Sequence, residues 1–201
     1  MDIAFWNQRY AVADHVYGEE PNAFVAQVAS QIPAGPVLCL AEGEGRNAVY
    51  LAQLGHPVTA VDQSEVGLAK ARRLAGRRGV EIETIVADLA RYAIEPDAWA
   101  GIVATFAHLP PPLRGEVHRA VAAGLRPGGV FVLEAYTPAQ LAFDTGGPKA
   151  PELLMTLDAL RGELPGLDLV IAREVERDVV EGPGHTGRGA VVQILARRNP
   201  T

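Results

Sequence analysis

The chain has 201 residues, of which 48% are apolar, and a formal net charge of −6. This length predicts one domain, and the apolar fraction is sufficient for one substantial core. The negative charge argues against a dedicated nucleic-acid-binding protein, and the lack of an apolar run of about 18 residues excludes a membrane-spanning helix. Arginines 72, 73, 77 and 78 form a local basic cluster, which we interpret as the solvated end of a helix.

Cys39 is the only cysteine, so an intrachain disulfide is impossible. Residues 1–6 lack the basic region and the apolar stretch of a signal peptide. We therefore expect a protein of the reducing cytoplasm.

From Pro36 onward, short β-rich runs alternate with helical patterns. The predicted strands are residues 37–40, 58–61, 81–87, 101–106 and 130–136. Residues 46–54 have helical composition and Gly55 can end that helix, while Ser64 and Gly79 are suited to cap and to stop the next one. The prolines 110–112 open a further helix. This alternation predicts βαβ units and a parallel sheet.

The C-terminal part has a different pattern. A helical stretch near residues 151–162 precedes two β-rich runs, 167–181 and 190–196. The glycine-rich segment 182–189 joins these runs, which predicts a β-hairpin. We expect an α/β fold with a doubly wound, mostly parallel, seven-stranded sheet that ends in an antiparallel hairpin.

No linker divides the chain, so residues 1–201 are predicted to form a single domain. Within it, residues 36–136 would form the cofactor-binding core. Residues 137–201 would supply a loop, a helix and the hairpin on the acceptor side.

The turn after the first strand, residues 40–48, carries the strongest functional signal. Glycines at a strand-to-helix turn let a ligand approach the backbone, and the helix N-terminus offers free N–H groups. Asp62 lies 19 residues after Gly43 and ends the second strand, where an acidic side chain can accept hydrogen bonds from both ribose hydroxyls. Together these features indicate a ligand that contains adenosine.

Two such ligands fit this turn. Residues 43–48 match the dinucleotide fingerprint G-x-G-x-x-(G/A), which favours NAD or NADP. However, Glu42 and Glu44 would then face an anionic pyrophosphate, whereas a sulfonium ligand without phosphate tolerates these charges. Asp88, which ends the third strand, is suited to an adenine amino group. The acids favour S-adenosylmethionine.

Residues 41–45, Ala-Glu-Gly-Glu-Gly, resemble motif I of class I S-adenosylmethionine-dependent methyltransferases, with Ala41 in place of the first glycine. Cys39 departs from that family, which usually has an acid there. Segments 5–10, 17–22, 134–138, 145–148 and 181–187 are similar to the tellurite-resistance-type methyltransferases. The resemblance covers roughly residues 5–198.

The resemblance implies an S-adenosylmethionine-dependent methyltransferase that acts on a small molecule, such as a thiol, or on a metalloid oxyanion, such as selenite or tellurite. Residues 1–20 would be an N-terminal lid, with its aromatic side chains over the sulfonium and Arg9 at the methionine carboxylate. The equally weighted alternative is that this segment only anchors the N-terminus to the core. The expected cofactor-binding residues are Trp6, Arg9, Tyr17, Ala41, Glu42, Gly43, Gly45, Asp62, Gln63, Asp88, Leu89 and Phe106.

The acceptor side carries three candidate residues. His185 would position or deprotonate the acceptor, because histidine changes charge near neutral pH, and Arg188 would bind its negative charge. His108, which follows the fourth strand, is an alternative base. The histidines show no ligand spacing with cysteines or carboxylates, so we expect no metal site. A nicotinamide oxidoreductase and a non-catalytic S-adenosylmethionine-binding module remain open as alternatives.

Overall fold

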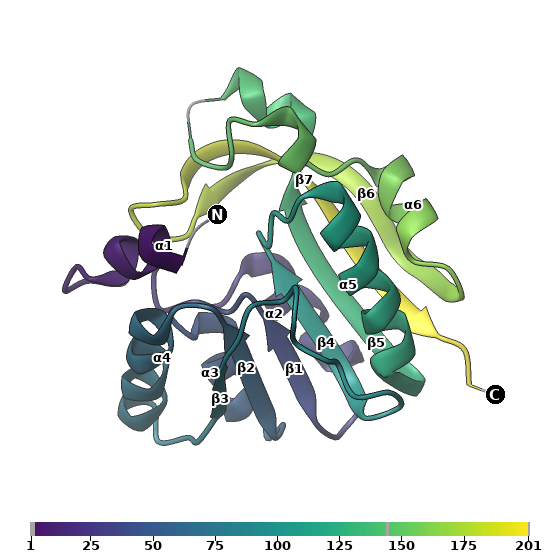
Figure 1. Cartoon of the computed structure of the whole chain (residues 1–201), viewed down its shortest axis with the longest axis horizontal. Coiled ribbons are helices and arrows are strands. Elements are labelled where there is room, and N and C mark those ends of the chain that lie inside the picture. Colours follow the sequence, from purple (N-terminus) through teal and green to yellow (C-terminus); the bar gives the residue numbers. More distant parts are fainter. Residues whose placement is uncertain (1–2, 144, 201) are drawn as a thin grey trace.

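The structure, a computed structural model, describes residues 3–143 and 145–200. Seven strands form one sheet in the order β3-β2-β1-β4-β5-β7-β6, with helices on both faces (Figure 1). The strands are β1 (Val37–Leu40), β2 (Val58–Asp62), β3 (Glu83–Val86), β4 (Trp99–Thr105), β5 (Leu125–Tyr136), β6 (Leu167–Val180) and β7 (Thr186–Arg198).

The helices follow the alternation that the sequence predicts. They are α1 (Ile3–Tyr10), α2 (Ala23–Val28), α3 (Arg46–Gln53), α4 (Glu65–Arg77), α5 (Pro111–Gly124) and α6 (Leu157–Glu163), with short 3₁₀ turns η1 (Ala29–Gln31), η2 (Pro138–Ala142) and η3 (Pro151–Leu153). Ser64 caps α4 by accepting a hydrogen bond from the backbone of Gly67, and both Gly55 and Gly79 have positive φ directly after their helices.

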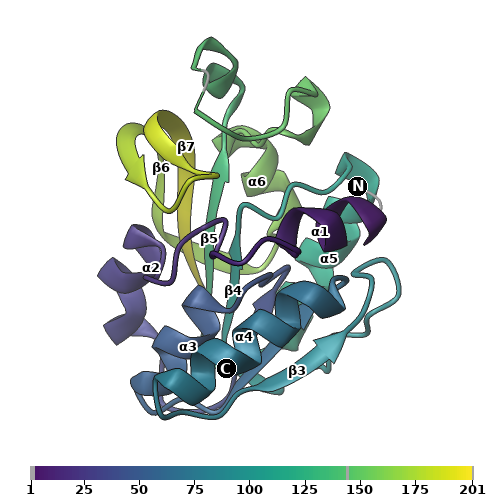
Figure 2. The ribbon, with the colours of Figure 1, turned by 90° about the vertical axis from the view of Figure 1, so that its left-hand side faces the viewer.

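Strands β1 to β5 are parallel, and β7 pairs antiparallel with both β5 and β6, which confirms the predicted fold class. Side chains of successive strand residues point to opposite faces of the sheet. On β1, Leu38 and Leu40 therefore join the core under α5 and α6, while Val37 and Cys39 join the core under α2, α3 and α4. Figure 2 shows these helical layers on the two sides of the sheet.

Two elements differ from the prediction. Residues 151–162 are not one helix, because the turn η3 ends at Leu153 and α6 starts only at Leu157, after its cap Thr156. The hairpin is longer than expected, since β7 begins at Thr186. Because β6 runs parallel to β5, the tip between β6 and β7 lies at the carboxyl edge of the parallel strands, as the sequence predicts.

Candidate functional site

A cavity of about 560 Å³ lies at the carboxyl ends of the parallel strands. Ligands of open α/β sheets bind at this edge. Segments that follow β1 to β5 line the cavity, and residues of the N-terminal segment together with His185 of the hairpin tip also face it. Its volume falls within the range of small-molecule sites.

The turn after β1 is shaped by backbone conformations that glycine adopts easily. Gly43 and Gly45 have φ of 62° and 91°, and even Ala41 has a positive φ of 50°. A Cβ atom on Gly43 would lie 2.6 Å from the Tyr10 hydroxyl, and one on Gly45 would lie 2.4 Å from Cβ of Ala71. Ala41 lines the cavity, whereas the two glycines allow close packing of α1 and α4 against the turn.

The two acids of this turn have different partners. Glu42 lines the cavity and accepts hydrogen bonds from the backbone N–H groups of Asn47 and Ala48, at 2.9 and 2.8 Å, at the start of α3. Burial raises the pKa of Glu42 to about 7, although these donors and Arg46 act in the opposite direction. Glu42 therefore exchanges a proton near neutral pH.

Glu44 also lines the cavity, but it is buried in an ion pair of 2.6 Å with Lys70 of α4. The Lys70 ammonium donates further hydrogen bonds to the carbonyls of Val12 and Asp14. The second oxygen of Glu44 accepts from the backbone N–H of Tyr17 at 3.3 Å. This pair therefore fastens the N-terminal segment to the core, whereas Glu42 is held by backbone N–H groups of α3.

Asp62 ends β2 and lines the cavity, and burial raises the pKa of its carboxyl group. One oxygen accepts from the backbone of Gly43 at 2.9 Å and the other from the backbone of Ser64 at 2.8 Å. Each carboxylate oxygen has a second lone pair. The backbone N–H of Gln63 also acts on this carboxyl group, so Asp62 holds the turn in place and keeps acceptor capacity for the ribose.

The remaining residues expected at the adenosine end also line the cavity. They are Gln63 after β2 and Asp88 and Leu89 after β3. Asp88 is exposed and accepts a hydrogen bond from the backbone of Ala90.

Trp6, Arg9 and Tyr17 lie over the cavity, so the N-terminal segment covers the site and is also anchored to the core. Arg9 donates from Nε to the Tyr17 hydroxyl at 2.6 Å. Trp6 stacks on Tyr10, whose ring is buried against the turn after β1. Figure 1 shows α1 above α4, which it contacts.

Phe106 follows β4 in a left-handed conformation, with φ of 54°, and lines the cavity. A positive φ is unfavourable for a bulky residue and is frequent at functional sites. The Phe106 ring contacts the His185 ring, with centroids 4.5 Å apart. This conformation turns the aromatic ring toward the hairpin tip.

His185 lines the cavity and is enclosed by the rings of Tyr17, Phe106 and Tyr136. Burial, with the charge of Arg46 as the next cause, lowers the pKa of His185 to about 3. This environment favours the neutral ring. The expected roles of His185, to position or to deprotonate the acceptor, stay predictions, and positioning is the one that a neutral ring serves better.

His108 lines the cavity but is held by the backbone on both sides. Its Nδ1 lies 3.0 Å from the carbonyl of Leu153, and its Nε2 accepts from the backbone of Tyr136 at 3.4 Å. Burial lowers its pKa to about 4. Through these two contacts with the backbone, His108 joins the loops after β4 and β5. Because both ring nitrogens are used in this way, the geometry does not support a role of His108 as base.

Arg188 does not reach the cavity, which corrects the prediction that it binds the acceptor. Its side chain is exposed on the hairpin and lies 3.4 Å from Glu176 and 3.8 Å from Asp178. Arg188 lies in β7 opposite Asp178 of β6, and its side chain is directed toward these acids of β6 and not toward the cavity.

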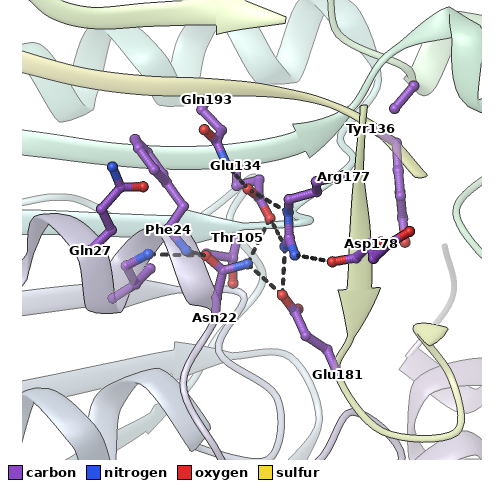
Figure 3. Close-up of polar contacts among 12 residues, drawn as sticks. Asn22, Phe24, Gln27, Thr105, Glu134, Tyr136, Arg177, Asp178, Glu181 and Gln193 are labelled. Carbon is purple, nitrogen blue, oxygen red and sulfur yellow. Dashed lines mark hydrogen bonds and ion pairs between the residues drawn. The ribbon is translucent and has the colours of Figure 1, made fainter. Parts of the chain in front are cut away.

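A buried polar network beside the cavity was not predicted from the sequence (Figure 3). Glu134 of β5 pairs with Arg177 of β6 and accepts from Gln193 of β7 and from Asn22, at 2.6 and 2.7 Å. Asn22 also caps α2. Acidic and amide residues within otherwise apolar strands were the sequence signal for this network. Which of these side chains bond to one another becomes clear only from the pairing of the strands in the sheet.

Glu181 extends this network to the hairpin tip. It pairs with Arg177 and with Arg46 of α3, each at 2.6 Å. Burial alone would raise the pKa of Glu181, but these two guanidinium groups lower it. Arg46 also lines the cavity. The network thus fixes the hairpin tip, and with it His185, against α3.

Within residues 3–143 and 145–200, no three His, Cys, Asp or Glu side chains gather so that they could hold a metal ion. Among the same residues, no helix is both long and apolar enough to cross a membrane.

Three arginines of the predicted basic cluster on α4 form ion pairs with glutamates. Arg72 pairs with Glu65, Arg77 with Glu19 and Arg78 with Glu20.

Sequence comparison identifies residues 37–129 as a match to the family described as "Methyltransferase domain". The uncharacterized methyltransferase YodH of Bacillus subtilis (strain 168) is 30% identical over 112 residues, which are 54% of this chain and 46% of that protein. The chain therefore spans about half the length of this curated relative.

Solved structures share the fold over nearly the whole chain. A structure from work on the conversion of a disulfide bond into a thioacetal group during echinomycin biosynthesis has a TM-score of 0.79 and 20% identity, over 98% of this chain and 90% of that chain. TehB from Haemophilus influenzae has a TM-score of 0.73 and 20% identity, over 97% of this chain and 66% of that chain.

Proposed function

We propose that this chain, whose residues 37–129 match the family described as "Methyltransferase domain", is a class I enzyme that transfers a methyl group from S-adenosylmethionine to a small-molecule acceptor. The observation that carries the proposal is the cavity at the carboxyl ends of β1 to β5, into which Asp62 and the turn after β1 project.

The residues present fit this cofactor. Asp62 retains lone pairs for the ribose hydroxyls, and Asp88 and Leu89 lie where an adenine ring would be bound. Arg9 uses Nε for Tyr17, so its terminal nitrogens are available for the methionine carboxylate. Glu42 faces the same cavity, where an anionic pyrophosphate would be repelled.

When bound, S-adenosylmethionine supplies a methyl group on a positively charged sulfur. The protein then has to align the acceptor opposite that sulfur and to exclude water. Trp6, Tyr17 and Phe106 enclose the space between the cofactor residues and His185. Their π faces also favour a cation.

We further propose that the acceptor atom is a soft nucleophile, either a thiol or a selenium or tellurium oxyanion. Soft acceptors need little proton abstraction, and the two histidines that line the cavity are poor bases.

Thermal melts with four nucleotides test the cofactor. S-adenosylmethionine and S-adenosylhomocysteine should stabilise the fold by roughly 2.7 kcal/mol at 100 times the dissociation constant, and NAD and NADP should not. Protection by NAD or NADP alone would contradict the proposal and favour an oxidoreductase. Binding without methyl transfer to thiols, selenite, tellurite or other small acceptors would favour a non-catalytic binding module.

A further inference from the structure

The cavity has two chemically different halves. The carboxylates that line it, among the described residues, are Glu42, Glu44, Asp62 and Asp88, and all of them follow β1, β2 or β3. Because the sheet order is β3-β2-β1-β4-β5, these acids lie on one side of the cavity. That side is the half assigned above to the cofactor.

The other half, above β4 and β5, is lined mainly by apolar side chains. Leu109, Pro110 and Leu113 follow β4, and Pro148, Ala150 and Leu153 follow β5. From α1, Phe5 also lines the cavity, and 44% of its surface is exposed. These side chains leave apolar surface in contact with water, which an apolar ligand would cover.

The cations near this half have partners within the protein or an assigned role. Arg46 pairs with Glu181 through Nη2, although its Nη1 has no hydrogen-bond partner among the described residues. Arg9 donates from Nε to Tyr17, and its terminal nitrogens are assigned above to the methionine carboxylate. Lys149 lines this half but has an interaction of its own within the protein. Arg188, the expected ligand of an oxyanion, lies outside the cavity. A small, strongly hydrated oxyanion would also lose its water against the apolar side chains of this half without a gain in apolar contact.

We infer that the acceptor is an organic thiol with an apolar body, which binds in the half of the cavity above β4 and β5, and not a bare metalloid oxyanion. This inference rests on the proposed function and narrows its acceptor class. The thiolate sulfur forms a bond to the methyl carbon while the bond from that carbon to the sulfonium sulfur breaks. The products are a methyl thioether and S-adenosylhomocysteine, and the thiol proton goes to solvent.

The side chains of the acceptor half agree with a thiol, whereas Glu42, the acid with a pKa of about 7, lies in the cofactor half and accepts from the backbone of α3. His108 has both ring nitrogens in contact with the backbone, and His185 lies in an aromatic enclosure. A thiol ionises without a protein base, because its own pKa is about 8.5. The rate should therefore rise with pH through the pKa of the thiol used, for the wild type and for His185→Ala alike.

The test compares phenylmethanethiol, 2-mercaptoethanol and selenite as acceptors. Each buried CH₂ group contributes about fourfold in affinity, so kcat/KM for phenylmethanethiol should exceed that for 2-mercaptoethanol by about thirtyfold or more. Leu113→Gln and Leu153→Gln should each lower the ratio of these two kcat/KM values about tenfold. Neither substitution should change the affinity for S-adenosylhomocysteine. Leu141→Gln is the matched control, since Leu141 is exposed on η2 and does not line the cavity.

A binding measurement provides a second readout. Calorimetric titration of the S-adenosylhomocysteine complex with phenylmethyl methyl sulfide, the expected product, should show about tenfold weaker binding in the two cavity variants than in Leu141→Gln. A kcat/KM for selenite above that for both thiols would overturn the inference. So would equal effects of all three substitutions on the thiol preference and on thioether affinity. In those outcomes S-adenosylhomocysteine still binds, whereas failure of the proposed function itself would abolish that binding.

Discussion

At the scale of single residues, the acids that suggest a cofactor also hold the backbone of the site. Asp62 accepts from the N–H groups of Gly43 and Ser64, and Glu42 accepts from those of Asn47 and Ala48. Buried N–H groups need such partners. These acids therefore shape the ligand site before any ligand binds, which links cofactor affinity to local stability.

Asp62→Ala should weaken binding of S-adenosylhomocysteine by about 1–3 kcal/mol, because the charged acceptor for the ribose is lost. The sequence alone suggests that the fold would not change. The structure adds an expected loss of about 1–3 kcal/mol in the free energy of unfolding, since two backbone N–H groups lose their acceptor.

Calorimetric titration and urea unfolding measure the two effects of Asp62→Ala separately. Asp88→Ala is the control for stability, because Asp88 is exposed and accepts from one N–H group. Unchanged affinity in folded Asp62→Ala would refute the ribose role, and unchanged stability would refute the structural role.

At the scale of elements, α5 and α6 are joined by a clamp around one carboxylate. Glu163 of α6 accepts from Nε and Nη2 of Arg114, at 2.9 and 2.6 Å, and lies 2.8 Å from Nδ1 of His118. Burial alone would raise the pKa of Glu163, but these two partners lower it to about 2. The clamp therefore fixes α6, which packs next to β6.

The contribution of Glu163 to stability should depend on pH. A carboxylate whose pKa is lowered by folding stabilises the protein above its unfolded pKa of about 4.5, and this contribution is lost as pH falls toward 2. Glu163→Gln should thus lower the free energy of unfolding by on the order of 2–3 kcal/mol at pH 7 and by much less at pH 3. Urea unfolding at both values checks this, with the exposed Glu152→Gln as the control. A cost independent of pH would contradict it.

At the scale of the whole molecule, the N-terminal segment and the hairpin tip hold each other in place. The backbone N–H of Gly184 donates to the carbonyl of Val16 at 2.8 Å, and the rings of Tyr17 and His185 are 4.5 Å apart. A Cβ atom on Gly182 would lie 2.3 Å from the backbone nitrogen of Gly18. The N-terminal segment and the hairpin tip thus face the same cavity as one unit.

Substitution of Gly182 should separate these two segments. Gly182→Ala should lower the affinity for S-adenosylhomocysteine about tenfold or more and cost about 1–3 kcal/mol in unfolding free energy through the clash. Gly166→Ala is a matched control, because Gly166 also has a positive φ, 79° against 72° for Gly182, but a Cβ atom there would meet no neighbour. Calorimetry on both variants measures their affinities for S-adenosylhomocysteine. Equal affinities would contradict the idea that the N-terminal segment and the hairpin tip hold each other in place.

The five parallel strands, the helices between them and the C-terminal hairpin could be predicted from the sequence, because hydrophobic periodicity, caps and turn glycines are local signals. The sequence also identified the turn after β1 and Asp62, since a strand, a turn and an acid in register are readable along the chain. The aromatic residues of the N-terminal segment were placed near the ligand by resemblance, and they line the cavity.

Only the tertiary structure decided the chemistry of the acceptor side. It excluded Arg188 from the cavity, engaged both nitrogens of His108 and kept His185 neutral. It also joined Glu134, Arg177 and Glu181 into a buried network across β5, β6 and the hairpin tip. The physical reason is that the direction of a side chain, its burial and its pKa depend on neighbours far away in the sequence, which no local pattern records.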